Sequence, residues 1–181
     1  MCFKEVPWNS SYFCLMQRHW RLPLLGFTLF MLGLTACNKL NLFERSVAIP
    51  KHEWKSNFEP SFTCSIKDTT SLYDIALVLR HRDRYHYNNI WLQFTIIDPS
   101  GQQFRFNTEK ILGTNEKGWL GVGMDDIYEH RLSLQSDIVK NGVSLRKKGS
   151  YQIRVKQIMR EDPLQEVMNV GVRIEKMTQR N

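Results

Sequence analysis

The chain has 181 residues, of which 42% are hydrophobic and 24% charged, so it carries enough apolar side chains to bury a core and is not intrinsically disordered. The length fits one globular domain with short additions, and the composition excludes a polytopic membrane protein. The formal charge of +7 comes from basic residues scattered among acidic ones, without a long basic run. Composition therefore predicts a folded domain but gives only weak evidence about partners.

The N-terminal segment has the layout of a bacterial export signal. Arg18 and Arg21 precede an apolar run over residues 22–34, which is shorter than the roughly 20 residues of a membrane-spanning helix. The alternatives are an uncleaved anchor and a cytoplasmic core helix, but the missing helix caps and the export-type flanks favour a cleaved signal. We expect a lipoprotein signal peptide over residues 1–36.

Residues 34–37, Leu-Thr-Ala-Cys, follow the apolar run and resemble the lipobox of bacterial lipoproteins. The resemblance implies that Cys37 becomes the new N-terminus and carries acyl chains on its sulfur and its amino group. Two or more chains anchor a protein stably, at about 0.8 kcal/mol per buried methylene. We expect a protein held by lipid in the cell membrane or the outer membrane, with its domain facing the periplasm or the cell surface.

The remaining cysteines depend on where translation starts. A start at Met1 gives an unusually long positive region, whereas a start at Met16 removes Cys2 and Cys14 from the protein. Cys64 lies in an alternating apolar stretch, which predicts a buried strand residue rather than a nucleophile. The cysteines show neither CxxC spacing nor a zinc-ligand pattern, so we expect no metal site and no disulfide framework.

The rest of the chain reads as a tether followed by strands. Residues 37–53 mix Asn, Lys, Ser and Pro with isolated apolar residues, which predicts a lipidated tether, and the folded domain is expected over residues 54–181. Apolar residues then alternate with polar ones, as in strands. Strands are expected at residues 62–66, 73–80, 90–97, 103–108, 127–134, 143–145, 151–159 and 169–176.

One turn supports the assignment of these strands. In Asp98-Pro99-Ser100-Gly101 the Asp side chain can accept hydrogen bonds from the backbone of the turn, and Pro fixes φ at the second position. This turn predicts a hairpin between the third and fourth strands. Residues 109–114 are expected to form a helical turn. About eight strands and no long helix predict an all-β fold: a single antiparallel β-sandwich, jelly-roll or immunoglobulin-like.

The sequence offers little for catalysis. His81 and His86 lack the neighbouring carboxylates or thiols of a metal site, and the glycines of residues 118–123 neither follow a strand–helix unit nor open a helix, as nucleotide binding requires. There is no GxSxG or HExxH motif. We expect no enzyme, no metal and no cofactor other than the covalent lipid on Cys37.

Residues 80–87 interleave arginines with Tyr85 and Tyr87. Such a stretch stacks on nucleic-acid bases in some proteins, but an exported lipoprotein meets little nucleic acid, and we expect no nucleic-acid partner. An anionic glycan is a better target, with Trp91 and Trp119 adding stacking surfaces. A polar loop between two strands fits the same residues equally well.

Short motifs along the domain follow one another in the order of a known family. They are Arg80, residues 85–91 (Tyr-His-Tyr-Asn-Asn-Ile-Trp), 99–101 (Pro-Ser-Gly), 118–121 (Gly-Trp-Leu-Gly), 149–151 (Gly-Ser-Tyr), 159–160 (Met-Arg) and 169–174 (Asn-Val-Gly-Val-Arg-Ile). Together with the lipobox, this series resembles the gliding-motility lipoproteins of the GldH family. The resemblance implies a non-catalytic cell-envelope lipoprotein that is needed for gliding and associated with protein secretion.

Two functional hypotheses follow. The first is an assembly component that binds other gliding or secretion envelope proteins and the membrane through its lipid; the second is a glycan- or surface-polymer-binding lipoprotein. Arg80 and Arg160 each end an apolar strand, where pairing with a carboxylate is favoured over presenting the planar guanidinium to a partner. The candidate partner-binding residues are Arg80, Tyr85, Tyr87, Trp91, Trp119 and Arg160.

Overall fold

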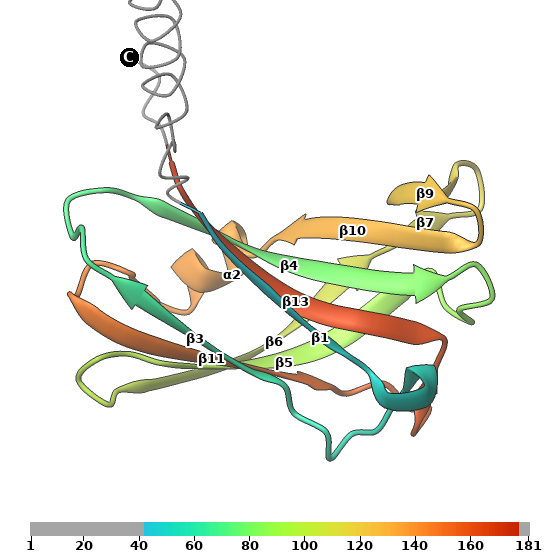
Figure 1. Ribbon diagram of the computed structural model, residues 1–181, viewed down its shortest axis with the longest axis horizontal. Coiled ribbons are helices and arrows are strands. Elements are labelled where there is room, and N and C mark those ends of the chain that lie inside the picture. The colour runs from blue at the N-terminus through green and yellow to red at the C-terminus, as the bar shows by residue number, and fades with distance from the viewer. Residues whose placement is uncertain (1–41, 178–181) are drawn as a thin grey trace, which may run out of the picture. The chain divides into compact units, whose positions relative to one another are not determined.

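Alternating apolar residues produce two antiparallel sheets that pack face to face in the computed structural model, which describes residues 42–177 (Figure 1). The first sheet has five strands in the order β1-β13-β4-β10-β9, and the second has four in the order β3-β11-β5-β6. The predicted all-β sandwich is confirmed. The predicted signal peptide over residues 1–36 and the predicted lipid site at Cys37 lie outside the described residues.

The bounds of the elements are as follows. The five-stranded sheet contains β1 (Leu42–Ala48), β13 (Val167–Lys176), β4 (Tyr73–Arg82), β10 (Ile127–Ser133) and β9 (Val122–Met124). The four-stranded sheet contains β3 (Ser61–Ile66), β11 (Gly149–Gln157), β5 (Asn89–Ile97) and β6 (Gln103–Ile111). Smaller elements are η2 (Pro50–His52), the pair β2 (Glu53–Trp54) and β12 (Leu164–Gln165), the pair β7 (Gly113–Thr114) and β8 (Gly118–Trp119), and α2 (Gln135–Lys140).

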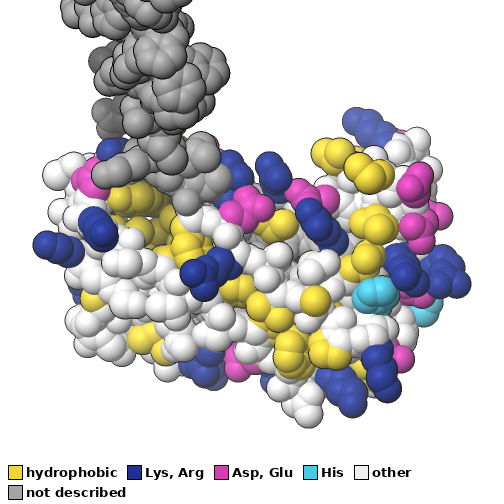
Figure 2. All heavy atoms as spheres, in the orientation of Figure 1, with side chains coloured by type: hydrophobic (Ala, Val, Ile, Leu, Met, Phe, Trp, Pro, Cys, Tyr) yellow, Lys and Arg dark blue, Asp and Glu magenta, His cyan; other side chains and the backbone are white. Residues whose placement is uncertain are grey.

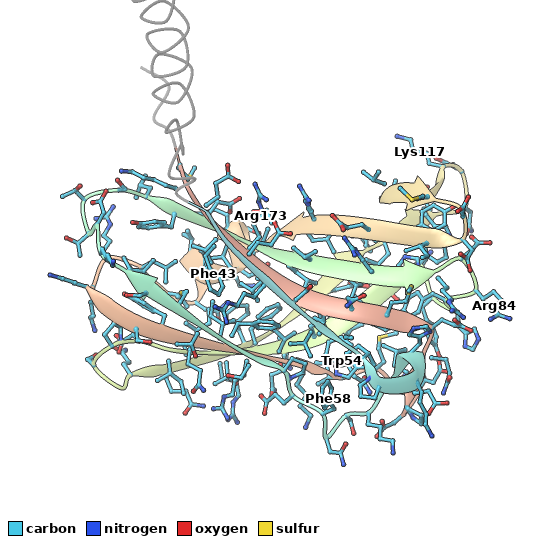
Figure 3. The ribbon with its side chains drawn as sticks, in the orientation of Figure 1. Phe43, Trp54, Phe58, Arg84, Lys117 and Arg173 are labelled. Carbon is cyan, nitrogen blue, oxygen red and sulfur yellow. The ribbon has the colours of Figure 1, made fainter. Side chains whose placement is uncertain are left out.

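The core lies between the two sheets and is filled by the inward-facing side chains of the long strands, whereas β9 is exposed. Leu77 and Leu79 of β4 and Phe94 and Ile153 of the other sheet are fully buried. Trp54 is also fully buried, and its indole Nε1 donates to the carbonyl oxygen of Phe58 at 2.8 Å, near the end of β1 (Figure 3). Burial of this apolar surface is the main source of stability for the sandwich.

The predicted turn between β5 and β6 is confirmed. The Asp98 carboxylate accepts from the backbone N–H of Ser100 and of Gln102, each at 2.9 Å, and Gly101 takes a φ of 84°. Lys147 donates to the same carboxylate at 2.5 Å, and this bond, with that from the Ser100 hydroxyl, holds the pKa of Asp98 well below its ordinary value. The turn therefore fixes the hairpin register through side-chain as well as backbone bonds.

The predicted tether is wrong for the part that the structure describes. Residues 42–48 form β1, which pairs antiparallel with β13 from Leu42 opposite Glu175 to Ala48 opposite Asn169. Phe43 and Val47 pack against the core, and Arg173 of β13 donates to Glu44 at 2.7 Å. The domain therefore includes residues 42–53 as an edge strand and a 3-10 turn.

Two further local predictions are also wrong. Residues 109–114 form the end of β6 and the short strand β7 instead of a helical turn, because β6 pairs with β5 as far as Ile111. Residues 143–145 form no strand; Val143 and Leu145 are buried as the chain runs from α2 to β11. A short apolar run bounded by Gly142 gives the same pattern as a strand but here only fills the core.

We predict that Gly171→Ala destabilises the domain by about 1–3 kcal/mol. A Cβ at Gly171 would lie 2.6 Å from the carbonyl oxygen of Arg45 and 2.8 Å from Cβ of Ser46, so β1 would have to move. Chemical unfolding of the purified protein measures the change, with Ser46→Ala on the facing strand as the control. If residues 42–48 were a loose tether, alanine would be neutral or stabilising relative to glycine.

Candidate functional site

Segments distant in sequence meet at one end of the five-stranded sheet. They are the loop that follows β4, the β7–β8 pair and the β9–β10 hairpin. Figure 3 shows Lys117 and Arg84 at this end of the long axis, and Phe43 of β1 toward the other end. We call this region the distal end, because it lies away from Leu42, where the described chain begins.

A buried pair of histidines forms the centre of the distal end. His81 on β4 and His130 on β10 are 0% and 2% exposed, and their Nε2 atoms lie 2.9 Å apart. His81 Nδ1 lies 2.7 Å from the carbonyl oxygen of Arg82, which can only accept, so Nδ1 carries the proton. In the neutral pair His81 Nε2 is therefore the acceptor and His130 Nε2–H the donor.

Burial lowers the pKa of both histidines, because a charged imidazolium loses its hydration inside the protein. The pKa of His130 falls from its ordinary 6.5 to about 4, with burial as the larger cause and the nearby His81 as the second. The pKa of His81 is also lowered, because burial outweighs the opposing effects of the Arg82 carbonyl and the Asp83 carboxylate. Both rings are neutral at pH 7.

Trp119 covers the histidine pair, which explains the Gly-Trp-Leu-Gly motif. Its ring meets His81 edge-on with centroids 4.4 Å apart, and its indole Nε1 donates to Asp83 at 2.8 Å. Gly121 lies directly over His130, since a Cβ there would come within 2.8 Å of Nε2. Trp119 is thus held by the fold, with its indole N–H already occupied.

Beside this cluster, the surface has a groove of about 740 Å³, which we call the distal groove. Its apolar lining includes Ile111, Leu120, Val122, Met124, Ile127 and Leu132. Four of these residues, Ile111, Leu120, Val122 and Met124, are 48%, 51%, 81% and 77% exposed. Figure 2 shows hydrophobic side chains at this end of the molecule and a hollow between the β9 region and the rest of the sheet. An exposed apolar groove of this kind marks a binding surface.

The rim of the distal groove is charged. Arg80 on β4 lies opposite Glu129 on β10 and donates to its carboxylate at 2.6 Å, and Arg131 donates to the other oxygen at 3.1 Å. The pairing of Arg80 with a carboxylate, favoured from the sequence, is confirmed. The two guanidinium groups lower the pKa of Glu129 against the opposing effect of its partial burial.

The other predicted binding residues do not form one surface. Tyr85 is 4% exposed, and its hydroxyl donates to the carbonyl of Asn89, while Tyr87 packs edge-on against the Tyr85 ring. Trp91 is 42% exposed on the four-stranded sheet, next to Met159, and Arg160 is exposed in the loop after β11. Of the six predicted residues, only Arg80 lines the distal groove.

The basic residues after β4 are paired with carboxylates of the same domain. Arg84 and Arg82 lie 3.3 and 3.9 Å from Glu166, at the turn between β12 and β13, and His86 lies 3.3 Å from Glu161. With Tyr85 buried and Trp119 half-buried, the aromatic and basic side chains needed for a glycan platform do not come together here. Trp91 alone among them is exposed as a stacking surface.

Sequence reasoning missed His130 and the apolar lining of the distal groove. The signal for β9 was present in Val122-Gly123-Met124, where apolar residues alternate around a glycine. Gly123 is needed because a Cβ there would lie 2.8 Å from the ring of Tyr128. The strand is evident only from its pairing with β10.

Within residues 42–177, no three His, Cys, Asp or Glu side chains come together as metal ligands. None of the described helices has the length and apolar character needed to cross a membrane. Cys64 is buried on β3, and burial raises the pKa of its thiol to about 11, so it is a protonated core residue.

The fold and the groove define an antiparallel β-sandwich domain with an exposed apolar groove at one end. The family model described as GldH lipoprotein matches residues 41–174, and the chain belongs to this family. The chain is 29% identical over 157 residues to the gliding motility lipoprotein GldH homolog of Christiangramia forsetii, covering 83% of this chain and 91% of the relative. It is 27% identical over 149 residues to the gliding motility lipoprotein GldH of Flavobacterium johnsoniae, covering 78% and 89%.

Two solved structures align with this chain at a low level of similarity. A protein from Sulfurospirillum deleyianum aligns with a TM-score of 0.40 and 12% identity, over 76% of this chain and 99% of that chain. The carbohydrate-binding module CBM28, specific for non-crystalline cellulose, aligns with a TM-score of 0.42 and 12% identity, over 75% and 73%. Similarity at this level says nothing about what this chain binds.

We predict that the free energy of unfolding falls as the pH is lowered from 6.5 to about 5. The unfolded chain binds protons on both histidines near their ordinary pKa of 6.5, whereas the fold keeps them neutral. The free energy of unfolding that depends on these neutral histidines is fully present above pH 6.5. It is lost as the pH falls toward the pKa of about 4 for folded His130. Urea unfolding across this window measures the slope.

The controls separate the buried pair from other titrating groups. Ordinary carboxylates have a pKa near ~4 and stay mostly ionised above pH ~5, so the histidines dominate the window. His130→Phe removes one buried imidazole and should flatten the slope, whereas Ser46→Ala, which changes no titrating group, should leave it unchanged. An equal slope in the wild type and His130→Phe would contradict the assignment.

Proposed function

We propose that this protein is a non-catalytic, lipid-anchored envelope component that serves gliding motility and the associated protein secretion by binding another envelope protein. The family match over residues 41–174 and two relatives named as gliding motility lipoproteins support the role in gliding. The distal groove is the observation that carries the binding role, because it exposes four large apolar side chains together.

The chemistry of the described residues supports a non-catalytic role. The buried thiol of Cys64 is protonated, and both nitrogens of His81 are engaged with Arg82 and His130. Trp119 and Gly121 close the histidine pair from outside. A general base must reach the proton that it removes, and these imidazoles are placed to fill the core instead.

The lipid on Cys37 is part of this proposal, and it gives the domain an orientation. Only residues 38–41 separate Cys37 from β1, and the chain from Cys37 to Leu42 spans at most ~18 Å when fully extended. A lipid on Cys37 would therefore hold the Leu42 end of the sheet near the membrane. The distal end would face away from it.

We predict that Cys37→Ala abolishes or strongly reduces colony spreading, because the folded domain leaves the membrane fraction. Spreading, membrane fractionation and the profile of exported proteins are measured in a strain that carries the variant in place of the wild-type gene. Cys64→Ala is the matched cysteine control. It removes a buried thiol at a cost of about 1 kcal/mol and should leave anchoring and spreading intact.

A variant at Cys37 that is absent from the membrane fraction yet supports normal spreading would contradict the anchored role. Normal spreading and secretion after deletion of the whole gene would overturn the function in gliding and secretion itself. Loss of spreading with a normal exported profile would remove only the link to secretion.

A further inference from the structure

We propose that the distal groove receives an extended segment of a partner protein, which adds a short strand beside β10 and places apolar side chains in the groove and a carboxylate at its rim. This inference rests on the proposed function and names the kind of partner. The protein would then join its partner by main-chain hydrogen bonds, as in other cases of strand addition.

The groove has the apolar character that such a segment needs. Four of the eight large hydrophobic residues exposed on the described domain line it: Ile111, Leu120, Val122 and Met124. Val122 and Met124 lie on the same face of β9, opposite Glu129 and Ile127 of β10. A strand added beside Arg131 would continue the line of β9, and its side chains on this face would follow Val122 and Met124 at every second residue.

The backbone beside the groove is open to strand addition. The pairing of β9 with β10 ends at Val122 opposite Glu129, and among residues 42–177 no strand continues along Arg131 to Ser133 on that side. The carbonyl oxygen of Glu129 points to this side, because it lies close to Gly121. The carbonyl oxygen of Ser133 points to the same side and accepts from Lys110 Nζ at 2.9 Å. Backbone groups alternate along a strand, so the N–H and C=O of Arg131 face the open edge.

The charge at the rim favours a carboxylate on the partner. Glu129 accepts from both Arg80 and Arg131, so two guanidinium groups share one carboxylate. Their side chains are 52% and 55% exposed, which leaves donors available to a second anion. The exposed acidic pair Asp125 and Asp126 lies at the β9–β10 turn, at the opposite end of β10 from Arg131.

The position of the groove selects a protein rather than the bilayer. Ala48, Asn169, Arg80, Glu129 and Val122 form one row across the five strands. This row lies six residues along β1 from Leu42, or about 20 Å. With Cys37 in the membrane, the groove would be directed into the space where other envelope proteins lie.

The test places a photoreactive benzoylphenylalanine at Val122 in the full-length lipoprotein, in intact cells of its own organism. Val122 is 81% exposed, so the replacement does not disturb the core. The matched control carries the same residue at Val139, a 66% exposed apolar position on α2 outside the groove. We expect a crosslink at Val122 and not at Val139, mapped by mass spectrometry to a segment with alternating apolar residues and an Asp or Glu.

A synthetic peptide of the crosslinked segment then tests the binding mode. Added to the purified lipoprotein, it should slow hydrogen exchange at the amide of Arg131, and Arg131→Glu should weaken its binding about tenfold or more. Met124 serves as a second crosslinking position if the Val122 variant is not produced.

Other outcomes overturn the proposal. In the crosslinking experiment, these are the absence of a crosslink at both groove positions, equal crosslinking at Val139, and a crosslink to a second copy of this chain or to lipid. In the peptide experiment, it is binding that leaves the Arg131 amide unprotected. None of these results depends on Cys37→Ala or on the gene deletion, so the proposed function can stand while the groove proposal fails.

Discussion

The antiparallel register between β4 and β10 is the constraint on which the distal end depends. It sets Arg80 opposite Glu129 on the outer face and brings His81 and His130 together on the inner face. A slip of one residue would move every side chain of β10 to the other face, breaking the ion pair and exposing the buried imidazole. Because β9 pairs with β10, the same register also places Val122 beside the rim of the groove.

Most of the fold was predictable because its long strands are buried on one face and alternate clearly. The hairpin at Asp98 was predictable because its turn chemistry is local. β1 was missed because it is an edge strand with only Phe43 and Val47 packed against the core, and its partner β13 lies more than a hundred residues away. Its mixed composition is also that of a linker, so only pairing separates the two.

The candidate site was less predictable than the fold, since it depends on contacts between distant segments. The sequence indicated the pairing of Arg80 with a carboxylate but not which one. It gave Trp119 as a stacking surface for a partner, whereas the indole packs against His81. Exposure was the quantity hardest to infer. Tyr85 is buried, whereas Val122 and Met124 are on the surface. From their residue types alone, Val122 and Met124 would be expected in the core.

Colony spreading by cells that carry Met124→Asp tests most directly whether the distal groove is a surface needed in the cell. Met124 is 77% exposed, so the charge should leave folding and the amount of membrane-bound protein unchanged. We expect spreading to be lost in this variant and retained in Val139→Asp on α2. Normal spreading by the Met124→Asp cells, with the protein present in the membrane, would contradict it.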